Sequence, residues 1–323
     1  GAAHRNTQVF PKCIPNPKGL ASAGRINEQN HPNMPYMPYL RTRSQKNHHF
    51  STTTHTMPRY KLTLEYEGTR YKGWQLQKNA RTVQGTIMDV CKNVFQTDDF
   101  ELQGAGRTDA GVHALGQVAH LDIKTSNLPL QTLLLRLNDQ LPHDINILTV
   151  EKADARFHAR HHAEARSYVY HLTTRRTALA KQYVWWVKDA LNVAAMQQAA
   201  TSMQGFHNFA SFTDDMPEDK STMVELIECS VQVNGGLIDV RVVGSHFLWK
   251  MVRRMVGVLV EIGRGNLPVE KAADFLQTYS RDPAKLTAPP SGLFLDKVYY
   301  DKAEVESGTP KGKAGNLGMV FNF

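Results

Sequence analysis

Cysteine is scarce in this chain of 323 residues, and its three cysteines lie far apart. Cys13, Cys91 and Cys229 form no closely spaced pair. This excludes a CxxC-type metal or redox motif and the dense disulfide framework of a small secreted domain. Cys91 and Cys229 lie among apolar residues, as buried free thiols do. The simplest interpretation is a set of reduced thiols in a reducing compartment, which favours a cytoplasmic location.

Long hydrophobic runs are also missing, although 41% of the residues are hydrophobic. No segment approaches the roughly 20 apolar residues that a transmembrane helix needs. We therefore expect no membrane partner. The chain is long enough for two domains of ordinary size, each with its own core.

Metal-ligand spacing is absent even though the chain has 14 histidines. The densest internal group is His158, His161 and His162, which has no HExxH spacing and no neighbouring cysteine. A surface role is favoured over ligation, so we expect no metal.

Acidic residues are almost absent from the first 57 residues, which contain seven lysines and arginines but only Glu28. The remaining residues carry 31 basic and 29 acidic side chains, so they are nearly neutral although the whole chain is +8. The high isoelectric point is therefore no argument for nucleic-acid binding. Segment 1–57 shows no sustained period and is predicted to be a disordered N-terminal extension. Its composition faintly resembles an organelle transit peptide; a cloning remnant or a translated upstream region is an equal alternative.

From Arg59 onward the pattern is that of a folded protein. Alternation of Tyr60, Leu62, Leu64 and Tyr66 with polar residues predicts a strand. Thr82 is predicted to cap a helix with an apolar face from residue 83 to 94. Further strands are expected at 100–104, 117–124 and 145–150, and a short helix at 130–137.

The second half of the chain repeats this mixture. A strand is expected at 168–172, a hairpin around Gly235-Gly236, and helices at 192–203, at 247–262 and from Pro268 to about 279. These patterns predict an α+β fold with two similar domains, 58–162 and 163–301. Each is expected to have an antiparallel or mixed sheet covered by helices, with the active-site cleft between them. Residues 302–323 are predicted to form a flexible tail.

The stretch most indicative of chemistry is GAGRTDAGVHA, residues 104–114. A single carboxylate, Asp109, lies among three glycines and small alanines. Glycines allow a ligand or another backbone to come close, which would place Asp109 at the bottom of a shaped site. The alternative is an ordinary turn or a helix cap. Spacing alone leaves both open and slightly favours the second.

Five motifs, taken in chain order, help to decide whether Asp109 belongs to a shaped site or to an ordinary turn. They are EYEGTRYKGWQLQ at 65–77, the 104–114 loop, RSYVY at 166–170, FLWKMVR at 247–253 and APPSGLFL at 288–295. Together they resemble the motifs of the tRNA pseudouridine synthase A family. The resemblance covers roughly residues 58 to 300 and leaves out both ends of the chain.

The resemblance implies conversion of uridine to pseudouridine in the anticodon stem-loop of tRNA, at positions 38, 39 and 40. In this reaction the bond from C1′ to N1 breaks, the uracil reorients, and C1′ bonds to C5. Nothing is added and no electrons leave, so no cofactor is expected. Members of the family act as homodimers, so tRNA and a second copy of the chain are the implied partners.

The resemblance also assigns roles to four residues. Asp109 is the expected nucleophile, which attacks the base or the sugar or removes the 2′ proton. Arg253 is expected to pair with it, because a charge in the apolar run around it is costly unless paired. Tyr168 is expected to stack on the uracil and to act as a general acid or base. Arg107 is expected to help extrude the target base. The plainer alternatives are a surface charge for Arg253, a core side chain for Tyr168, and a loop–carboxylate pair for Arg107.

Weaker candidates surround these four. Thr108 is expected to position the loop, and His113 to contact RNA or to form loop hydrogen bonds. Candidates for contacts with the RNA backbone, of which a minority is expected to function, are Arg59, Arg70, Lys72, Lys78, Arg81, Arg156, Arg160, His161, Arg166, Arg175 and Arg176.

Two other functions fit part of the pattern. One is a non-catalytic RNA-binding or tRNA-folding protein on the same fold, against which Asp109, Tyr168 and Arg253 argue. The other is an unrelated metal hydrolase built on the histidine cluster, against which the missing ligand spacing argues.

Overall fold

The computed structural model describes residues 58–124, 128–215 and 221–307. These residues belong to one compact unit, Thr54–Phe323. The predicted disordered extension, residues 1–57, lies outside the described residues. Within the described ranges, no helix is long and apolar enough to span a bilayer.

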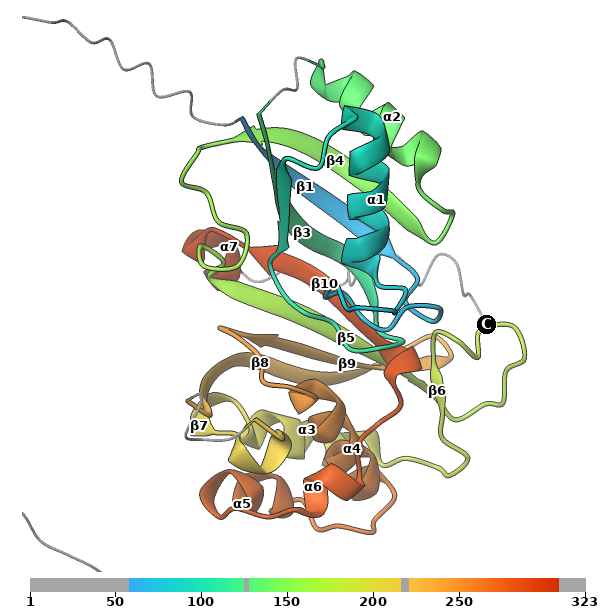
Figure 1. Ribbon diagram of the computed structural model, residues 1–323. Helices are drawn as coiled ribbons and strands as arrows, with labels where there is room; N and C mark the ends of the chain where they lie inside the picture. Colours follow the sequence, from blue (N-terminus) through green and yellow to red (C-terminus); the bar gives the residue numbers. More distant parts are fainter. Residues whose placement is uncertain (1–57, 125–127, 216–220, 308–323) are drawn as a thin grey trace, which may run out of the picture. The chain divides into compact units, whose positions relative to one another are not determined.

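The strands of the described residues form one mixed sheet (Figure 1). Its order is β4-β1-β3-β10-β5-β9-β8-β7, with β2 paired to β3 and β6 paired to β5. The β3–β10 and β5–β6 pairs are parallel, and the other pairs are antiparallel. The strands are β1 Arg59–Tyr66, β2 Phe100–Gly104, β3 His113–Ile123, β4 Ile145–Ala153, β5 Ala165–Thr173, β6 Trp185–Trp186, β7 Gly205–Asn208, β8 Met223–Asn234, β9 Leu237–Gly244 and β10 Leu293–Tyr299.

β1 confirms the strand that alternation predicts. Tyr60, Leu62, Leu64 and Tyr66 are all buried, whereas the residues between them are half-buried. Alternate side chains of a strand point to opposite faces, so the apolar set faces the core.

β10 joins the two halves of the chain. Phe294 and Leu295 pair with His113 and Ala114 of β3, and the other edge of β10 pairs with β5. Strands from both predicted domains therefore share one sheet, whereas the sequence pattern predicts a sheet in each. The mixed architecture agrees with the α+β class. The division into domains 58–162 and 163–301 stays a prediction.

The helices form two groups along the sheet (Figure 1). In one, α1 and α2 contact each other and lie beside β2 and β4; in the other, α3 packs on β8 and contacts α4 and α5. One hydrophobic core includes residues of both groups. The helices are α1 Val83–Phe95, α2 Leu130–Gln140, α3 Val193–Ser202, α4 Met251–Gly263, α5 Lys271–Gln277, α6 Asp282–Lys285 and α7 Lys302–Glu306, with short 3₁₀ turns at Ala210–Phe212 and Pro290–Gly292.

α1 begins where the sequence predicts. Thr82 precedes the helix, and its hydroxyl accepts a hydrogen bond from the Gly85 N–H at 3.2 Å. This satisfies one of the free N–H groups of the first turn.

α4 corrects the predicted helix over 247–262. It begins only at Met251, because Lys250 adopts a left-handed conformation with φ of 61°. Two aspartates hold this turn: Asp215 accepts the Trp249 N–H at 3.0 Å, and Asp214 pairs with Lys250 and Arg254. Apolar periodicity does not reveal such a turn, since Phe247 and Leu248 fit the helical pattern equally well.

The predicted flexible tail also needs correction at its start. Lys302–Glu306 forms α7, in which the Asp301 carboxylate caps the helix by accepting the Ala303 N–H at 2.8 Å. Lys297 of β10 pairs with Glu304 of this helix. Residues 308–323 lie outside the described residues.

Candidate active site

The 104–114 loop runs from the end of β2 to the start of β3 and is shaped by close backbone packing. A Cβ on Gly104 would come within 2.5 Å of the buried Trp74 ring. One on Gly73 would meet the Thr108 carbonyl, and the Trp74 N–H donates to that same carbonyl at 3.1 Å. Gly111 has a φ of 79°, which an L side chain rarely adopts. The first motif and the loop are therefore packed together, backbone against backbone.

Asp109 lies beside Arg253, as the sequence predicts. The Arg253 Nη1 donates to Asp109 Oδ2 at 3.2 Å, across 144 residues of chain. The side chains are 24% and 14% exposed for Asp109 and Arg253 respectively, so the pair is partly shielded from solvent yet reachable. The predicted ion pair is confirmed, and the alternative of a surface charge at Arg253 is wrong.

Arg253 is itself fixed by the segment that follows α6. Its Nε donates to the Ala288 carbonyl at 2.7 Å, and its own carbonyl accepts the Ala288 N–H at 3.0 Å. The Tyr170 hydroxyl donates to the next carbonyl, that of Pro289, at 2.7 Å. Tyr170 thus helps to hold the segment that fixes Arg253.

Tyr168 is buried on β5, and its ring meets that of Phe247 edge-on at 5.0 Å between centroids. Burial raises the pKa of the phenol to about 12; Arg166 lowers it and Asp109 raises it further. Tyr168 therefore lies within the electrostatic influence of Asp109. The phenol is neutral at physiological pH.

Tyr66 is a member of this group that sequence reasoning missed. Its hydroxyl lies 2.8 Å from the Thr108 Oγ1, one residue before Asp109. Burial raises the pKa of Tyr66, and Tyr168 adds to the effect. The contact supports the positioning role expected of Thr108. Alternation predicts that Tyr66 faces inward but does not reveal which residue it meets.

His113 is buried at the end of the loop. Its Nδ1 accepts the Gly68 N–H at 2.9 Å, its Nε2 lies 3.0 Å from the Gln182 carbonyl, and its ring stacks on Phe294. Burial lowers the pKa of His113, opposed by Glu67. Of the two roles expected for His113, loop hydrogen bonding is the one this geometry supports, because a ring that is 1% exposed offers RNA no surface.

Arg107 is exposed at the middle of the loop. Among the described residues it makes no ion pair or side-chain hydrogen bond, so the alternative of a loop–carboxylate pair is not found.

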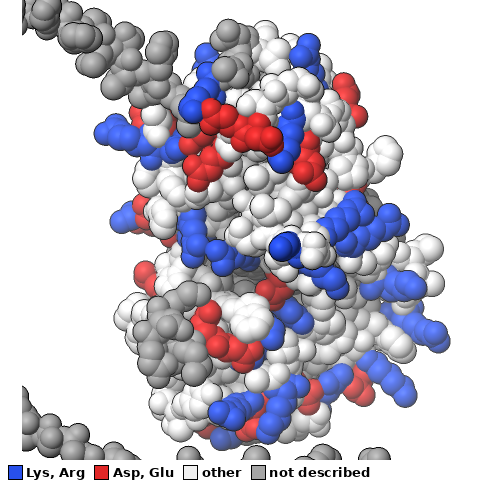
Figure 2. Space-filling model, viewed as in Figure 1, with Lys and Arg blue, Asp and Glu red and all other residues white. Residues whose placement is uncertain are grey.

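The RNA-contact candidates differ in ion pairing and in burial, and Arg81 and Arg156 are exposed although they are paired. Arg59 pairs with Asp122, Arg81 with Asp144 and Arg156 with Asp154, and Arg166 is buried. Exposed members include Arg70, Lys72, Lys78, Arg160, His161, Arg175 and Arg176. Figure 2 shows Lys and Arg side chains on both sides of a hollow near the middle of the face that it presents.

The histidine cluster shows no sign of a metal site. The His158 Nδ1 accepts the N–H groups of Arg160 and His161, and the rings of His158 and His161 lie 4.2 Å apart. In the described ranges, no group of three or more His, Cys, Asp or Glu side chains could hold a metal ion.

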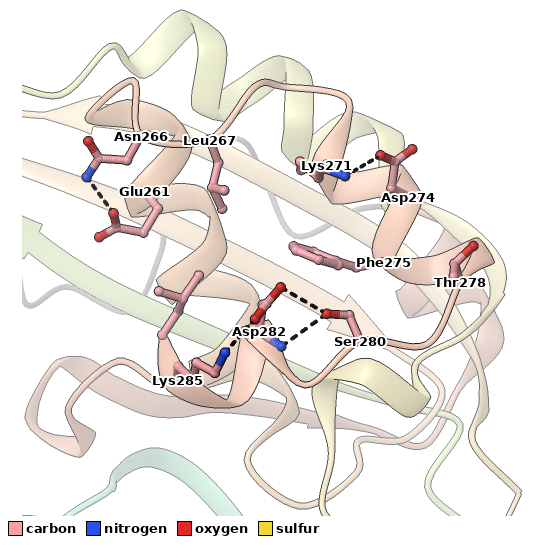
Figure 3. A pocket seen from close by; sticks show the side chains of 11 residues that line it. Glu261, Asn266, Leu267, Lys271, Asp274, Phe275, Thr278, Ser280, Asp282 and Lys285 are labelled. Carbon is pink, nitrogen blue, oxygen red and sulfur yellow. Dashed lines mark hydrogen bonds and ion pairs between the residues drawn. The ribbon is translucent and has the colours of Figure 1, made fainter.

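A pocket of about 430 Å³ lies along α4, α5 and α6 (Figure 3). Its rim charges pair with one another, Lys271 with Asp274 and Lys285 with Asp282, around the Phe275 ring. It is lined by none of the predicted site residues, so we assign it no part in the chemistry.

Comparison with known proteins bears on this arrangement. A family described as tRNA pseudouridine synthase matches residues 63–162 and 199–301. A protein named tRNA pseudouridine synthase A 2, from a strain of Bacillus cereus, is 37% identical over 247 residues, 76% of this chain and 100% of the relative. A tRNA pseudouridine synthase A from Brucella ovis is 40% identical over 249 residues, 76% of this chain and 98% of the relative.

A solved structure described as a dye-decolorizing protein from V. cholerae aligns with a TM-score of 0.16 at 11% identity, covering 73% of this chain and 96% of that one, and carries no argument. The family match spans both halves of the chain and includes Asp109 and Arg253, whereas β5, with Tyr168, lies between the two matched segments. The chain therefore belongs to the tRNA pseudouridine synthase family of isomerases.

Proposed function

We propose that this chain converts uridine to pseudouridine in the anticodon stem-loop of tRNA, at positions 38, 39 and 40, with Asp109 as the nucleophile. The observation that carries the proposal is the Asp109–Arg253 ion pair, formed between a loop and a helix 144 residues apart. Family membership supplies the reaction, and the names of the relatives supply the tRNA substrate.

Asp109 acts at the carbon–nitrogen bond. Its carboxylate bonds to C1′ or to the uracil ring, or takes the 2′ proton, while the C1′–N1 bond breaks. The uracil turns and C1′ bonds to C5, while the bond to Asp109 breaks or the 2′ proton returns to the sugar; the C5 proton then leaves and N1 gains a proton. Atoms and electrons balance without a cofactor. Arg253 orients the carboxylate, because its own guanidinium is fixed by the Ala288 carbonyl.

Tyr168 supplies a neutral phenol within the electrostatic influence of this carboxylate. A pKa of about 12 leaves almost no phenolate at physiological pH. This supports stacking on the uracil and donation of a proton, and it disfavours the role of general base that the sequence left open.

Arg107 and other exposed basic residues contact the RNA. An unreacted base lies in the stem-loop stack and must be flipped out, which costs a few kcal/mol. Arg107 is exposed on the Asp109 loop and can fill the vacated space. Arg70, Lys72 and Arg160 are exposed and available to the phosphates.

A second copy of the chain is part of the proposal. Residues 58–323 carry 31 basic and 29 acidic side chains and are nearly neutral, so a positive RNA surface gains from two copies side by side. We expect light scattering on the purified protein to give twice the mass of one chain.

The test is pseudouridine mapping on tRNA transcripts. We expect product at positions 38, 39 and 40, none when these are replaced by cytidine, and the same rate with a chelator present. Tight tRNA binding without product would support a non-catalytic RNA-binding protein instead. Loss of activity in the chelator would support a metal enzyme.

A further inference from the structure

We propose that Arg166 is a positioning residue. It fixes the relative positions of three parts of the chain: the 104–114 loop that carries Asp109 (the Asp109 loop), β5, and the segment between β9 and α4. Nothing in the sequence motif distinguishes this role from an RNA contact, which is the function the sequence suggests for Arg166. The inference rests on the proposed function.

Arg166 is buried at the start of β5, with 8% of its surface exposed. Its guanidinium donates to four carbonyls. Nη1 reaches Ser245 at 2.9 Å and Ala163 at 3.3 Å, and Nη2 reaches Arg160 at 2.7 Å and Ala105 at 3.1 Å.

These four acceptors are brought together from different parts of the chain. Ala105 begins the Asp109 loop, Arg160 and Ala163 form the turn before β5, and Ser245 follows β9. Arg166 itself lies two residues before Tyr168. Ser245 lies two residues before Phe247, which packs on the Tyr168 ring. The Arg166 side chain thus contacts the loop that carries Asp109 and the segment that precedes α4, the helix of Arg253. Arg166 also lies on the same strand as Tyr168.

The contact with Ala105 bears directly on Asp109. The Ala105 N–H donates to the Val118 carbonyl at 2.7 Å while its own carbonyl accepts from Arg166. The next carbonyl, that of Gly106, accepts from the Gln117 side chain at 3.0 Å. The loop is therefore held on both sides at a point four residues before Asp109.

The charge of Arg166 is balanced by dipoles. Among the described residues it forms no ion pair with a carboxylate, and burial lowers its pKa. A buried cation without a carboxylate is costly, so carbonyl acceptors must compensate for the lost water. Only a planar fork with several N–H donors reaches four carbonyls at once, which a lysine cannot do.

The experiment compares Arg166→Lys with a matched control, Arg241→Lys. Arg241 is a half-buried arginine of the same sheet, and it forms ion pairs with Glu228 and Asp296. Pseudouridine formation is measured in a single turnover by release of tritium from C5 of uridine, tRNA Kd by filter binding, and Tm by thermal unfolding. Arg166→Gln is the second variant, in case Arg166→Lys does not fold.

Because misplacement by about 1 Å can slow catalysis about a hundredfold, we expect Arg166→Lys to lose roughly tenfold to a hundredfold in rate. Its Kd should change less than about threefold, and Arg241→Lys should keep its rate within about twofold at a similar loss of Tm. Equal rates in the two variants would overturn the proposal. A loss confined to Kd, with a weaker salt dependence, would make Arg166 a phosphate contact instead.

If wild-type protein forms no pseudouridine, the proposed function fails, and hydrogen exchange then tests Arg166 separately. We expect residues 104–111 to exchange faster in Arg166→Lys than in Arg241→Lys. Equal protection would overturn the positioning role.

Discussion

At the scale of the residue, the site depends on charges placed where each has a defined partner. Asp109 has Arg253, and Arg253 has the Ala288 carbonyl. Partial burial strengthens each of these electrostatic contacts compared with one on an open surface, because water competes less for the charged groups.

Arg253→Leu tests the first of these contacts. It leaves the Asp109 carboxylate without its cation, and we expect the rate to fall about a hundredfold or more. The free energy of unfolding should fall by about 1–3 kcal/mol. Arg264→Leu, at the other end of α4 and also ion-paired, is the control and should keep its rate. A near-normal rate in Arg253→Leu would refute the pairing, as measured by tritium release and urea unfolding.

His120 gives a prediction for the dependence of stability on pH. Its Nδ1 accepts the Ala159 N–H at 3.1 Å, and burial, helped by Arg59 and His158, lowers its pKa from 6.5 to about 4. Between these two pH values the unfolded chain binds a proton that the native ring does not. The free energy of unfolding therefore falls as the pH drops from 6.5 to 4.

His120→Asn keeps an acceptor for the Ala159 N–H and cannot titrate. We expect it to remove on the order of 1–2 kcal/mol of this acid-dependent loss, measured by urea unfolding at several pH values. Identical pH profiles for the variant and the wild type would contradict the assignment.

At the scale of the element, the Asp109 loop is a packed structure and not a flexible hairpin. Gly104 and Gly73 lie where a side chain would strike Trp74 and the Thr108 carbonyl. Their role is close packing of the chain on itself, whereas Gly106 faces open space.

Gly104→Ala tests this difference against Gly106→Ala. The added methyl group at Gly104 would lie 2.5 Å from a fully buried Trp74, so we expect a loss of about 1–3 kcal/mol in the free energy of unfolding. At Gly106 the change should stay within about 0.5 kcal/mol. Thermal unfolding of both variants checks the prediction; equal Tm values would show that the loop adapts.

At the scale of the whole molecule, residues 58–323 carry too little net charge to bind RNA by charge excess. Binding therefore depends on where the exposed cations lie. Lys72 lies between Tyr71 and Gly73, which both touch the Asp109 loop: the Tyr71 carbonyl accepts the Gly111 N–H, and Gly73 packs on Thr108.

Lys72→Ala is expected to weaken tRNA binding at low salt and to reduce the salt dependence of log Kd by about one unit. Lys92→Ala, which removes a lysine paired with Asp98 at the end of α1, should leave both unchanged. Filter binding at several salt concentrations measures the two variants. A salt dependence that is the same in Lys72→Ala as in the wild type would remove Lys72 from the interface.

The sequence predicted local features better than distant ones. Alternation in β1 and the Thr82 cap are local signals, and the motifs paired Asp109 with Arg253 because each occupies a family position. The parallel pairing of β10 with β3 and the four carbonyls around Arg166 depend on residues far apart in the chain, which no local period encodes. The sequence did not predict the turn at Lys250, because the two aspartates that hold it lie in a distant segment. Asp215 lies 34 residues before Trp249, and Asp214 lies 36 residues before Lys250.

Asp109→Asn is the most direct test of the nucleophile. The change keeps size and hydrogen-bonding capacity but removes the charge, so the fold and the tRNA Kd should be nearly unchanged. We expect single-turnover pseudouridine formation to fall by at least about a thousandfold, since no other group can replace the carboxylate. A rate within about tenfold of the wild type would contradict the central claim.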